Sequence, residues 1–447
     1  MIIVDRALER RRDEGRPIRV GLVGAGFAGR GVVHQIVTAT PGMEVVAVSN
    51  RTIGEAERAF RDAGVDAVAR VDSVRDLEVA IERGRPAVTD DPEVVCGAGP
   101  IDVIVEATGE VMFGVHVASA AIANGKHIVL VNAELDSTLG PILKVHADRA
   151  GVVLTDMDGD QPGVLLNLAR EAQMLGFRPL LLGNIKSLLD HYRTPETQRG
   201  FAERVFQRPK MITSFADGTK IAAEMAVVAN ASGFRVGKRG MYGPAAGHVD
   251  EAARLFDLDE LLRGGLVDYI IGAEPSFGVF VLGYNEKPLT QRYMSIYKMG
   301  PGPVYMFHRP YHLGPLEAPL SIARAVLFGD ASVAPRGAPV CDVITLAKRD
   351  LRAGETLDGI GGFTVYGMLE NSDVAVAEDL LPMGLSDGCV VVRDLTRDTP
   401  IAYADIQVPP DRLADRLRAE QAATFPGHPG SAATAPVWAG RPFRGPR

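Results

Sequence analysis

The sequence predicts an α/β protein in which a parallel sheet comes first, an α+β domain follows and a small β-rich module comes last. Three observations predict this order. Over residues 18–155, short β-branched runs alternate with helical stretches, which is typical of a parallel sheet covered on both faces. Over residues 156–335 a helix leads into strands of mostly antiparallel type, and over residues 336–410 short strands and turns take over. We therefore expect three domains, at residues 1–155, 156–335 and 336–410.

Two further stretches stand apart from these domains. Residues 56–100 are charged and helical in pattern, so we expect them to form a helical insertion within the first domain. Residues 424–447 are rich in glycine, proline, alanine and serine without periodicity, and we expect a disordered tail there.

Composition and charge limit the classes of function. Hydrophobic residues make up 46% of the chain and charged residues 23%, which is ordinary for a globular protein with full-sized cores. The formal net charge of −8, without a basic stripe, argues against binding nucleic acid, and no apolar run is long enough to span a membrane. Cys96, Cys341 and Cys389 lie far apart and in no metal-like spacing, as in a reducing cytosol. We therefore expect a cytoplasmic protein whose partner is a small-molecule substrate.

A glycine motif follows the first predicted strand. The segment GLVGAGFAG supplies Gly24, Gly26 and Gly29 in G-x-G-x-x-G spacing, directly after the strand IRVGLVG and before a helix. The three glycines allow a tight turn, close approach to a pyrophosphate and close packing of the helix on the strand. This context predicts a Rossmann domain whose cofactor contacts include Phe27 and Ala28 at the start of the helix. The alternative is a simple tight turn in a chain that has 49 glycines.

The end of the second strand indicates which dinucleotide binds. It reads Ser49-Asn50-Arg51, where an NAD site usually places an acid that binds the ribose 2′-hydroxyl. An arginine beside a hydroxyl fits a 2′-phosphate instead, because the guanidinium matches phosphate oxygens. We therefore expect NADP(H) as the cofactor. The alternative is that Arg51 points into water.

Polar residues also follow the later strands of the first domain. Thr108 and Gly109 end the segment DVIVEATG, and Asn132 and Glu134 follow HIVLV. Ligands of doubly wound sheets bind outside the carboxyl ends of the strands. We expect these residues to contact the nicotinamide half, although ordinary loop polarity is the alternative.

Candidate catalytic residues appear early in the second domain. Lys186 lies in GNIKSLLDHYRTP, directly after an apolar strand, where it could act as a general acid or hold a substrate oxygen. Glu224 lies in KIAAEMAVVAN, on a helix that should be mostly buried, so its carboxylate needs a partner or a raised pKa. A surface lysine and a structural salt bridge are the respective alternatives. His191 and Arg193 of the first segment are candidates for substrate contact.

A second polar cluster lies in FHRPYHLGPLEAP, near the end of a later strand. It contains His308, Arg309, His312 and Glu317. Arg309 suits a phosphate or carboxylate group, and His312 suits proton transfer near neutral pH. The alternative for the histidines is a structural role.

Three aspartates could bind a divalent metal. Asp156, Asp158 and Asp160 lie two residues apart in TDMDGDQP, at the carboxyl edge of the predicted sheet. Carboxylates at this spacing could bind Mg²⁺ or Mn²⁺ together with a substrate. The spacing matches only part of a calcium loop, so the ligand set stays open.

Several separated motifs occur in the order of one known family. They are GLVGAGFAG, VIVEATG, GKHIVLVNAE, SFADGTKIAAEMAVVANASG, FHRPYHLGPLEAPLSIAR and AKRDLRAGETLDGIGG, and they cover most of residues 15–410. With them the chain resembles the homoserine-dehydrogenase-related oxidoreductases that carry a C-terminal SAF module, and within that group the 1-deoxy-D-xylulose 5-phosphate reductoisomerase-like enzymes. The resemblance implies a Rossmann domain that binds NADP(H), an α+β substrate and dimerisation domain, a SAF-like module at residues 336–410, and a homodimer.

The resemblance also implies an activity: NADPH-dependent oxidation or reduction, with or without isomerisation, of a small sugar phosphate or sugar-derived acid. Lys186 matches a lysine of the reductoisomerase-like pattern, and Asp160 lies where that pattern has a Gly-Asp-Glu-Pro run, which reads Gly-Asp-Gln-Pro here. Glu134 stands where homoserine dehydrogenases have a lysine. Two alternatives remain, a homoserine-type dehydrogenase of amino-acid metabolism and a non-catalytic nucleotide-binding protein.

Overall fold

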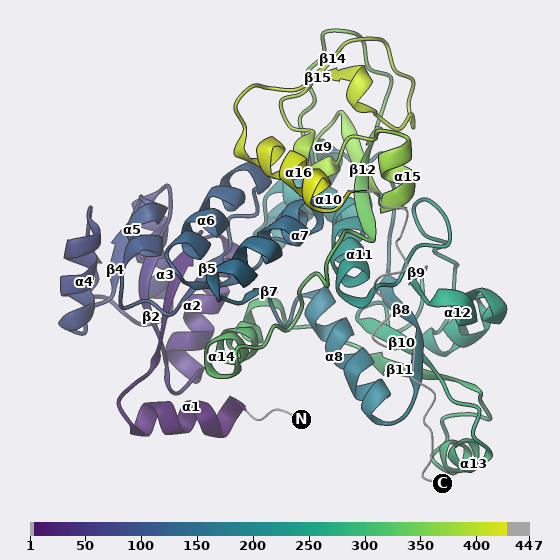
Figure 1. Ribbon diagram of the computed structural model, residues 1–447, viewed down its shortest axis with the longest axis horizontal. Coiled ribbons are helices and arrows are strands. Elements are labelled where there is room, and N and C mark those ends of the chain that lie inside the picture. Colours follow the sequence, from purple (N-terminus) through teal and green to yellow (C-terminus); the bar gives the residue numbers. More distant parts are fainter. Residues whose placement is uncertain (1–3, 427–447) are drawn as a thin grey trace. The chain divides into compact units, whose positions relative to one another are not determined.

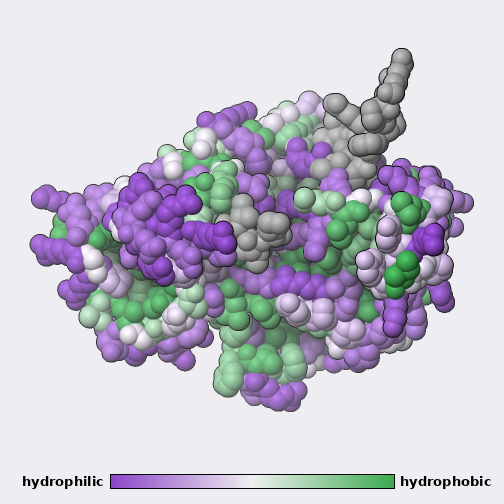
Figure 2. All heavy atoms as spheres, turned by 90° about the horizontal axis from the view of Figure 1, so that it is seen from below, coloured by the Kyte–Doolittle hydropathy of each residue, from purple (hydrophilic) through white to green (hydrophobic). Residues whose placement is uncertain are grey.

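The computed structural model describes residues 4–426 of the 447-residue chain (Figure 1). The chain divides into two compact units, each assembled from separate stretches of sequence. The first unit comprises residues up to 163 with residues 313–334 and 410–424, and the second comprises residues 164–312 and 335–409. No helix within residues 4–426 combines the length and apolarity needed to cross a membrane. Hydrophilic and hydrophobic residues are intermixed on the face shown in Figure 2.

A parallel sheet of seven strands forms the centre of the first unit. The strands are β1 (Ile18–Val23), β2 (Met43–Ser49), β3 (Ala69–Arg70), β4 (Ala87–Thr89), β5 (Val103–Glu106), β6 (His127–Leu130) and β7 (Leu154–Asp156). They lie in the order β3-β4-β2-β1-β5-β6-β7, and every pair is parallel. The central strands are buried almost throughout, which is why their sequences are continuous apolar runs and do not alternate.

Helices cover both faces of this sheet. They are α1 (Val4–Asp13), α2 (Phe27–Ala39), α3 (Ile53–Asp62), α4 (Val74–Glu82), α5 (Pro92–Gly97), α6 (Val111–Ala123), α7 (Ala133–Ala150), η2 (Gly314–Leu316), α14 (Ala318–Phe328) and α16 (Leu413–Thr424). α1, α2, α3 and α14 share one core with the sheet. α5, α6, α7 and α16 pack against one another, and α5 also contacts β1. Two of these helices, α14 and α16, come from stretches far along the chain.

The predicted parallel α/β sheet is confirmed, but one expectation about it was wrong. Residues 56–100 are not a purely helical insertion, because they also contribute β3 and β4, which extend the sheet beyond β2. These strands have only two and three residues, too few to show a periodicity in the sequence. The expected tail at residues 424–447 lies outside the described residues except for its first three.

A mixed sheet of four strands organises the second unit. Its strands are β8 (Arg178–Lys186), β9 (Leu266–Ile271), β10 (Val279–Tyr284) and β11 (Val304–Arg309), in the order β11-β10-β8-β9. Only the pair β8–β9 is parallel. The helices around it are α8 (Gln161–Met174), which begins at the boundary with the first unit, α9 (Pro195–Arg204), α10 (Pro209–Ala216), α11 (Thr219–Ser232), η1 (Val249–Arg254), α12 (Leu258–Gly264) and α13 (Pro288–Ile296).

The C-terminal module of the second unit packs on α11. It contains the antiparallel pairs β12 (Cys341–Ala347) with β13 (Val365–Asn371), and β14 (Val390–Val391) with β15 (Ile406–Gln407), together with α15 (Ser372–Ala377), η3 (Met383–Leu385) and η4 (Tyr403–Asp405). α11 contacts β12, β13 and β9, so residues 219–230 are all buried. Asn230 joins helix to module, because its Oδ1 accepts hydrogen bonds from the backbone N–H groups of Val340 (2.7 Å) and Cys341 (3.1 Å).

One buried carboxyl group predicts how the stability of the protein depends on pH. Asp136, in the first turn of α7, is 1% exposed, and neither carboxylate oxygen has a hydrogen-bond partner. Burial raises its pKa from 3.8 to about 7. Because the folded value lies above the unfolded one, this group lowers the free energy of unfolding as the pH rises from about 4 to about 7, by up to about 4 kcal/mol.

We expect Asp136→Asn to remove that part of the pH dependence and to stabilise the protein at alkaline pH. Urea unfolding followed by circular dichroism at about pH 5 and about pH 8 would measure it. Asp148→Asn, at an exposed position of the same helix, is the matched control. The same decline in stability in Asp136→Asn as in the unmodified protein would contradict the prediction.

Candidate active site

The glycine loop between β1 and α2 is packed too closely for side chains. Gly24 has φ +104°, and a Cβ on it would lie 2.6 Å from the Ala107 carbonyl group after β5. A Cβ on Gly29 would lie 1.9 Å from the Gly24 carbonyl oxygen. The first glycine therefore allows the turn and the third allows α2 to pack against the loop, as the motif predicted.

The start of α2 is open where a pyrophosphate would bind. Gly26 is the N-cap residue, no side chain caps this helix end, and a Cβ on Gly26 would meet no atom within 4 Å. Phe27 is 54% exposed and Ala28 is partly exposed. Backbone N–H groups and the positive end of the helix dipole at such a site favour phosphate groups. The loop therefore fits a dinucleotide.

The residues after β2 divide into one that holds the loop and one that faces solvent. Asn50 accepts a hydrogen bond from Ala25 N–H (3.0 Å) through its Oδ1, so it anchors the glycine loop, and Ser49 is buried. Arg51 is exposed. The nearest downstream acid, Glu55, forms an ion pair with Arg30 (2.9 Å). Arg51 is therefore the exposed charged group at this strand end, which is the position that suits a 2′-phosphate.

The loop after β5 is held by a buried carboxylate. Glu106 is fully buried at the end of β5 and accepts hydrogen bonds from the Thr108 N–H group (2.9 Å) and the Thr108 hydroxyl group. Burial raises the pKa of Glu106, and the bonds from Thr108 oppose the shift. Gly109 is exposed with φ +68°. Because this loop packs against Gly24, Glu106 supports the shape of the cofactor loop.

Asn132 and Glu134 begin α7 and are both buried. Asn132 caps the helix by accepting a hydrogen bond from Leu135 N–H (3.1 Å). Asn132 and Glu106 lie so close to Gly114 of α6 that a Cβ there would be 3.0 Å from the Asn132 amide and 3.2 Å from the Glu106 carboxylate. Glu134 is 4% exposed. Asn132 thus has a structural role in addition to the cofactor contact expected for it.

In the second unit, Lys186 ends strand β8 in a cluster of charged groups. Its Nζ lies 3.4 Å from the carbonyl oxygen of Phe215, near the end of α10. Burial lowers the pKa of Lys186 and Lys220 adds to this, while Glu224 and Asp217 oppose it. Lys220, Glu224 and Asp217 are 7%, 4% and 0% exposed. A lysine with a lowered pKa beside a second lysine and two carboxylates can donate or accept a proton near an anionic ligand.

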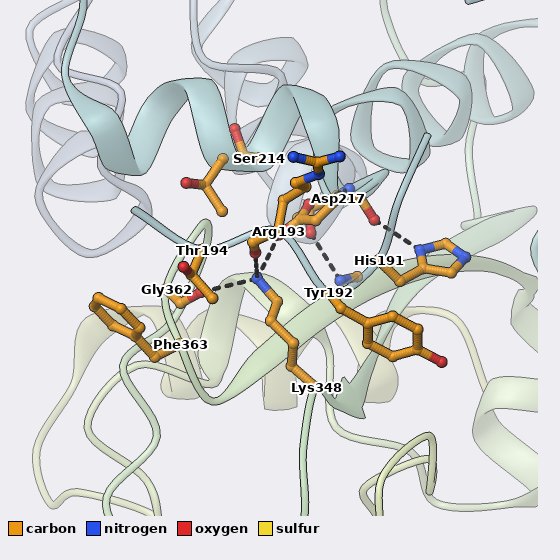
Figure 3. Close-up of polar contacts among 12 residues, drawn as sticks. His191, Tyr192, Arg193, Thr194, Ser214, Asp217, Lys348, Gly362 and Phe363 are labelled. Atoms are coloured by element: carbon orange, nitrogen blue, oxygen red, sulfur yellow. Dashed lines mark hydrogen bonds and ion pairs between the residues drawn. The ribbon is translucent and has the colours of Figure 1, made fainter. Parts of the chain in front are cut away.

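The residues that follow Lys186 have structural partners (Figure 3). Asp190 accepts a hydrogen bond from Arg193 Nε (2.9 Å). His191 Nδ1 lies 2.7 Å from the Asp217 carbonyl oxygen, and its ring stacks on Tyr366 of β13 at 4.6 Å. His191 therefore connects its segment to the end of α10 and to β13, whereas the Arg193 side chain pairs within the segment. Contact of His191 and Arg193 with substrate stays a prediction.

The register of the strands places Arg309, from the polar cluster predicted in FHRPYHLGPLEAP, at the same end of the four-stranded sheet as Lys186. Val279 of β10 pairs with Asn184 of β8 on one side and with Arg309 of β11 on the other. Neighbouring strands are about 4.8 Å apart, so the backbones of Arg309 and Asn184 are roughly 10 Å apart. The Arg309 guanidinium lies over Tyr311 at 4.5 Å.

The histidines of this cluster lie on β11 and just after it. His312 stacks on Phe277 at 4.4 Å. His308 lies on β11 itself, and burial lowers its pKa, while Asp250 opposes the shift and His248 adds to it.

The remaining candidates belong to the first unit. Asp160 accepts a hydrogen bond from the N–H of Gln161 (3.0 Å). Asp158 accepts one from the Ser332 hydroxyl group (2.6 Å) and lies 4.0 Å from Arg324. Glu317, at the start of α14, also belongs to this unit. Among residues 4–426, no three His, Cys, Asp or Glu side chains are arranged to hold a metal ion, so the structure shows no ligand set there for the Mg²⁺ or Mn²⁺ that the three aspartates could have bound.

Sequence reasoning missed four residues of these sites, Glu106, Lys220, Lys348 and Asp217. Glu106 had a visible signal, since it is the single acid in the strand VIVE, directly before Ala-Thr-Gly. Lys220 stands on the same helix as Glu224, one turn earlier, which places both side chains on one face. Lys348 had no signal, because its partner Asp217 is 131 residues away in the sequence.

Comparison with known proteins finds a match between part of this chain and an oxidoreductase family. Residues 159–318 match the family described as oxidoreductase DRL, catalytic domain, which is less than half of the 447-residue chain. No curated protein matches the chain. The catalytic-domain match and the dinucleotide-binding geometry of the first unit make the chain an NAD(P)-dependent oxidoreductase.

Similar solved structures include three oxidoreductases. A homoserine dehydrogenase from Thiobacillus denitrificans is 15% identical with a TM-score of 0.41, over 86% of this chain and 98% of that chain. The NADPH complex of 1-deoxy-D-xylulose 5-phosphate reductoisomerase from Zymomonas mobilis is 17% identical with a TM-score of 0.32, over 47% and 56% of the two chains. An NAD-binding oxidoreductase from Klebsiella pneumoniae is 17% identical with a TM-score of 0.27, over 40% and 44%. The chain thus spans less than two thirds of the last two proteins.

Two glycine variants should separate cofactor binding from folding. In Gly26→Ala the added methyl group meets no protein atom, so we expect unchanged stability but weaker binding of dinucleotide, because the methyl group occupies the approach of the pyrophosphate. In Gly29→Ala the methyl group overlaps the Gly24 carbonyl oxygen, so we expect lower stability as well. Fluorescence titration with NADPH and thermal unfolding would measure both effects. Unchanged NADPH affinity in Gly26→Ala would contradict the assignment.

Proposed function

We propose that the protein is an NADPH-dependent oxidoreductase, of the 1-deoxy-D-xylulose 5-phosphate reductoisomerase-like type, that acts on a small sugar phosphate or sugar-derived acid. The observation that carries this proposal is the cluster around Lys186. It combines a lysine of lowered pKa, a second buried lysine and two buried carboxylates at one end of β8. A charged cluster of this kind at a strand end is expected where a protein binds and protonates an anionic substrate.

The first unit supports the choice of NADPH. The open start of α2 would hold the pyrophosphate, and Arg51 would bind the 2′-phosphate through charge-assisted hydrogen bonds. NADPH, when bound, would supply the hydride. Glu106 and Asn50 hold the two loops that border this site, through Thr108 and Ala25 respectively.

The second unit would supply the proton and bind the substrate. We assign Lys186 as the general acid that protonates the substrate oxygen as hydride arrives, because its lowered pKa makes release of the proton easier. Lys220 would attract the anionic group of the substrate, and Arg309 would bind a phosphate or carboxylate at the same sheet edge. Glu224 opposes the lowering of the Lys186 pKa and so favours the protonated form that a general acid needs.

The other expectations about the whole protein stay part of this proposal. We propose that it is a cytoplasmic homodimer whose residues 336–410 form a SAF-like module.

Cofactor preference tests the role of Arg51. We expect the unmodified protein to bind NADPH more tightly than NADH, and Arg51→Ala to weaken NADPH binding by about tenfold to a hundredfold while NADH binding changes little. Isothermal titration with both dinucleotides would measure this. Arg58→Ala, at an exposed position of α3, is the control. Comparable affinity of the unmodified protein for NADH and NADPH would count against the NADP assignment.

Turnover tests the role of Lys186. NADPH oxidation would be followed with keto-sugar phosphates, sugar acids and aspartate semialdehyde, with and without Mn²⁺. On the substrate found, we expect Lys186→Ala to reduce kcat by about 10²–10⁴-fold and to leave NADPH affinity unchanged. Lys287→Ala, at an exposed position of the same unit, should keep full activity.

The pH profile gives a second readout of the same residue. Because the general acid must be protonated, kcat should fall as the pH rises through a pKa below the ordinary lysine value of 10.5. Full turnover by Lys186→Ala would show that Lys186 has no catalytic role. Turnover of aspartate semialdehyde alone would instead favour a homoserine-type dehydrogenase.

A further inference from the structure

A lysine of the C-terminal module is buried beside the candidate catalytic cluster. Lys348 follows β12, and its side chain is 2% exposed. Its Nζ donates three hydrogen bonds, to the Arg193 carbonyl oxygen (2.9 Å), the Gly362 carbonyl oxygen (2.8 Å) and Asp217 Oδ2 (2.9 Å). Figure 3 shows these three contacts converging on the ammonium group. All three ammonium protons are therefore used inside the protein.

Asp217 is the charged partner of this lysine and is also fully buried. While Oδ2 binds Lys348, Oδ1 accepts a hydrogen bond from Thr219 N–H (2.9 Å) at the start of α11. The Asp217 carbonyl oxygen faces His191 Nδ1. Burying a carboxylate is costly unless such partners compensate for its lost hydration.

The same turn of the chain also contacts Lys186. The ammonium group of Lys186 lies beside the carbonyl oxygen of Phe215, two residues before Asp217. The charged groups that act on Lys186 are Glu224, Asp217 and Lys220, and Asp217 is one of the two that favour its protonated form. The end of α10 therefore stands between Lys186 on one side and Lys348 on the other.

Other contacts fix the module against this turn. The N–H of Gly367 in β13 donates to Thr219 Oγ1 (2.8 Å), and the Tyr366 ring stacks on His191. Lys210 of α10 donates to the Asp358 carbonyl oxygen (2.6 Å) of the loop that precedes β13. Of these contacts, only the one between Lys348 and Asp217 joins two charges.

We infer that Lys348 is a positioning residue for Lys186: it holds the Asp217 carboxylate in place at the end of α10, in the turn of the chain that Lys186 also contacts, so the C-terminal module completes the candidate active site. The inference extends the proposed function, since it takes Lys186 as the general acid. A purely structural role of Lys348 would hold the segments together without acting on the charge of Lys186. Measurement of the pKa of Lys186 therefore distinguishes a positioning role of Lys348 from a purely structural one.

The test measures the pKa of Lys186 directly. The rate of acetylation of Lys186 by acetic anhydride, followed by mass spectrometry across pH, reports its deprotonated fraction in the full-length protein. Lys348→Met removes the cation that holds the Asp217 carboxylate in place, so this carboxylate supports the charge of Lys186 less. Asp217→Asn removes the carboxylate charge itself with almost the same shape. We expect each variant to lower the Lys186 pKa by about one unit.

The double variant and a control sharpen the test. Because Lys348 is inferred to act through Asp217, adding Lys348→Met to Asp217→Asn should lower the Lys186 pKa no further than Asp217→Asn alone. Lys210→Met, which removes an exposed lysine that binds a backbone carbonyl oxygen of the module, should leave it unchanged. Lys348→Arg should recover part of the shift, because it restores the charge.

Two results would overturn the inference. One is an unaltered Lys186 pKa in a folded Lys348→Met protein. If that variant fails to fold, the result that decides is an unaltered pKa in the nearly isosteric Asp217→Asn. Because acetylation needs no turnover, these results are separate from the kcat of Lys186→Ala, which tests the proposed function alone.

Discussion

The burial of α11 over residues 219–230 constrains the rest of the second unit. Its first turns carry Lys220 and Glu224, and Asp217 stands directly before it, so charges that would normally be hydrated are enclosed by protein. Removing such groups from water costs several kcal/mol each unless other charges and hydrogen bonds compensate. Segments from distant parts of the sequence therefore converge there: Lys186 from the end of β8, and Lys348 from the C-terminal module. The buried charges of this cluster need one another for stability. Burial of Lys186 among them gives it the lowered pKa that suits proton transfer.

In the first unit, the candidate site is shaped by close contacts between backbone segments. In the second unit, it is shaped by charged side chains. Gly24 and Gly29 allow the loop, the start of α2 and the end of β5 to lie within contact of one another. Glu106 then holds the neighbouring loop through Thr108, and Gly114 leaves space for Glu106 and Asn132. The outcome is a rigid border around an exposed helix start, which is the preorganised form that an anion site needs.

Sequence patterns predicted these features unequally. The glycine motif was read correctly because all its requirements are local: one turn, one strand and one helix within a dozen residues. Residues 56–100 were read incorrectly, because β3 and β4 are too short to show a strand period. In the stretch from 183 to 195, the site roles of Lys186, His191 and Arg193 stay predictions. The contacts of His191 with Asp217 and Tyr366 join residues far apart in the sequence, so no local pattern reveals them.

By itself, then, the sequence determined the α/β class and the glycine loop, and it predicted the arginine after β2 and the lysine after β8 as site residues. These depend on periodicity and on spacing within one supersecondary unit, where neighbours in sequence are also neighbours in space. Only the tertiary structure decided that residues 313–334 and 410–424 return to the first unit and that Lys348 pairs with Asp217. It also decided which ionisable groups near Lys186 are structural. Such pairings depend on burial and on contacts across more than a hundred residues, because a charge acquires its role from what surrounds it once water is excluded.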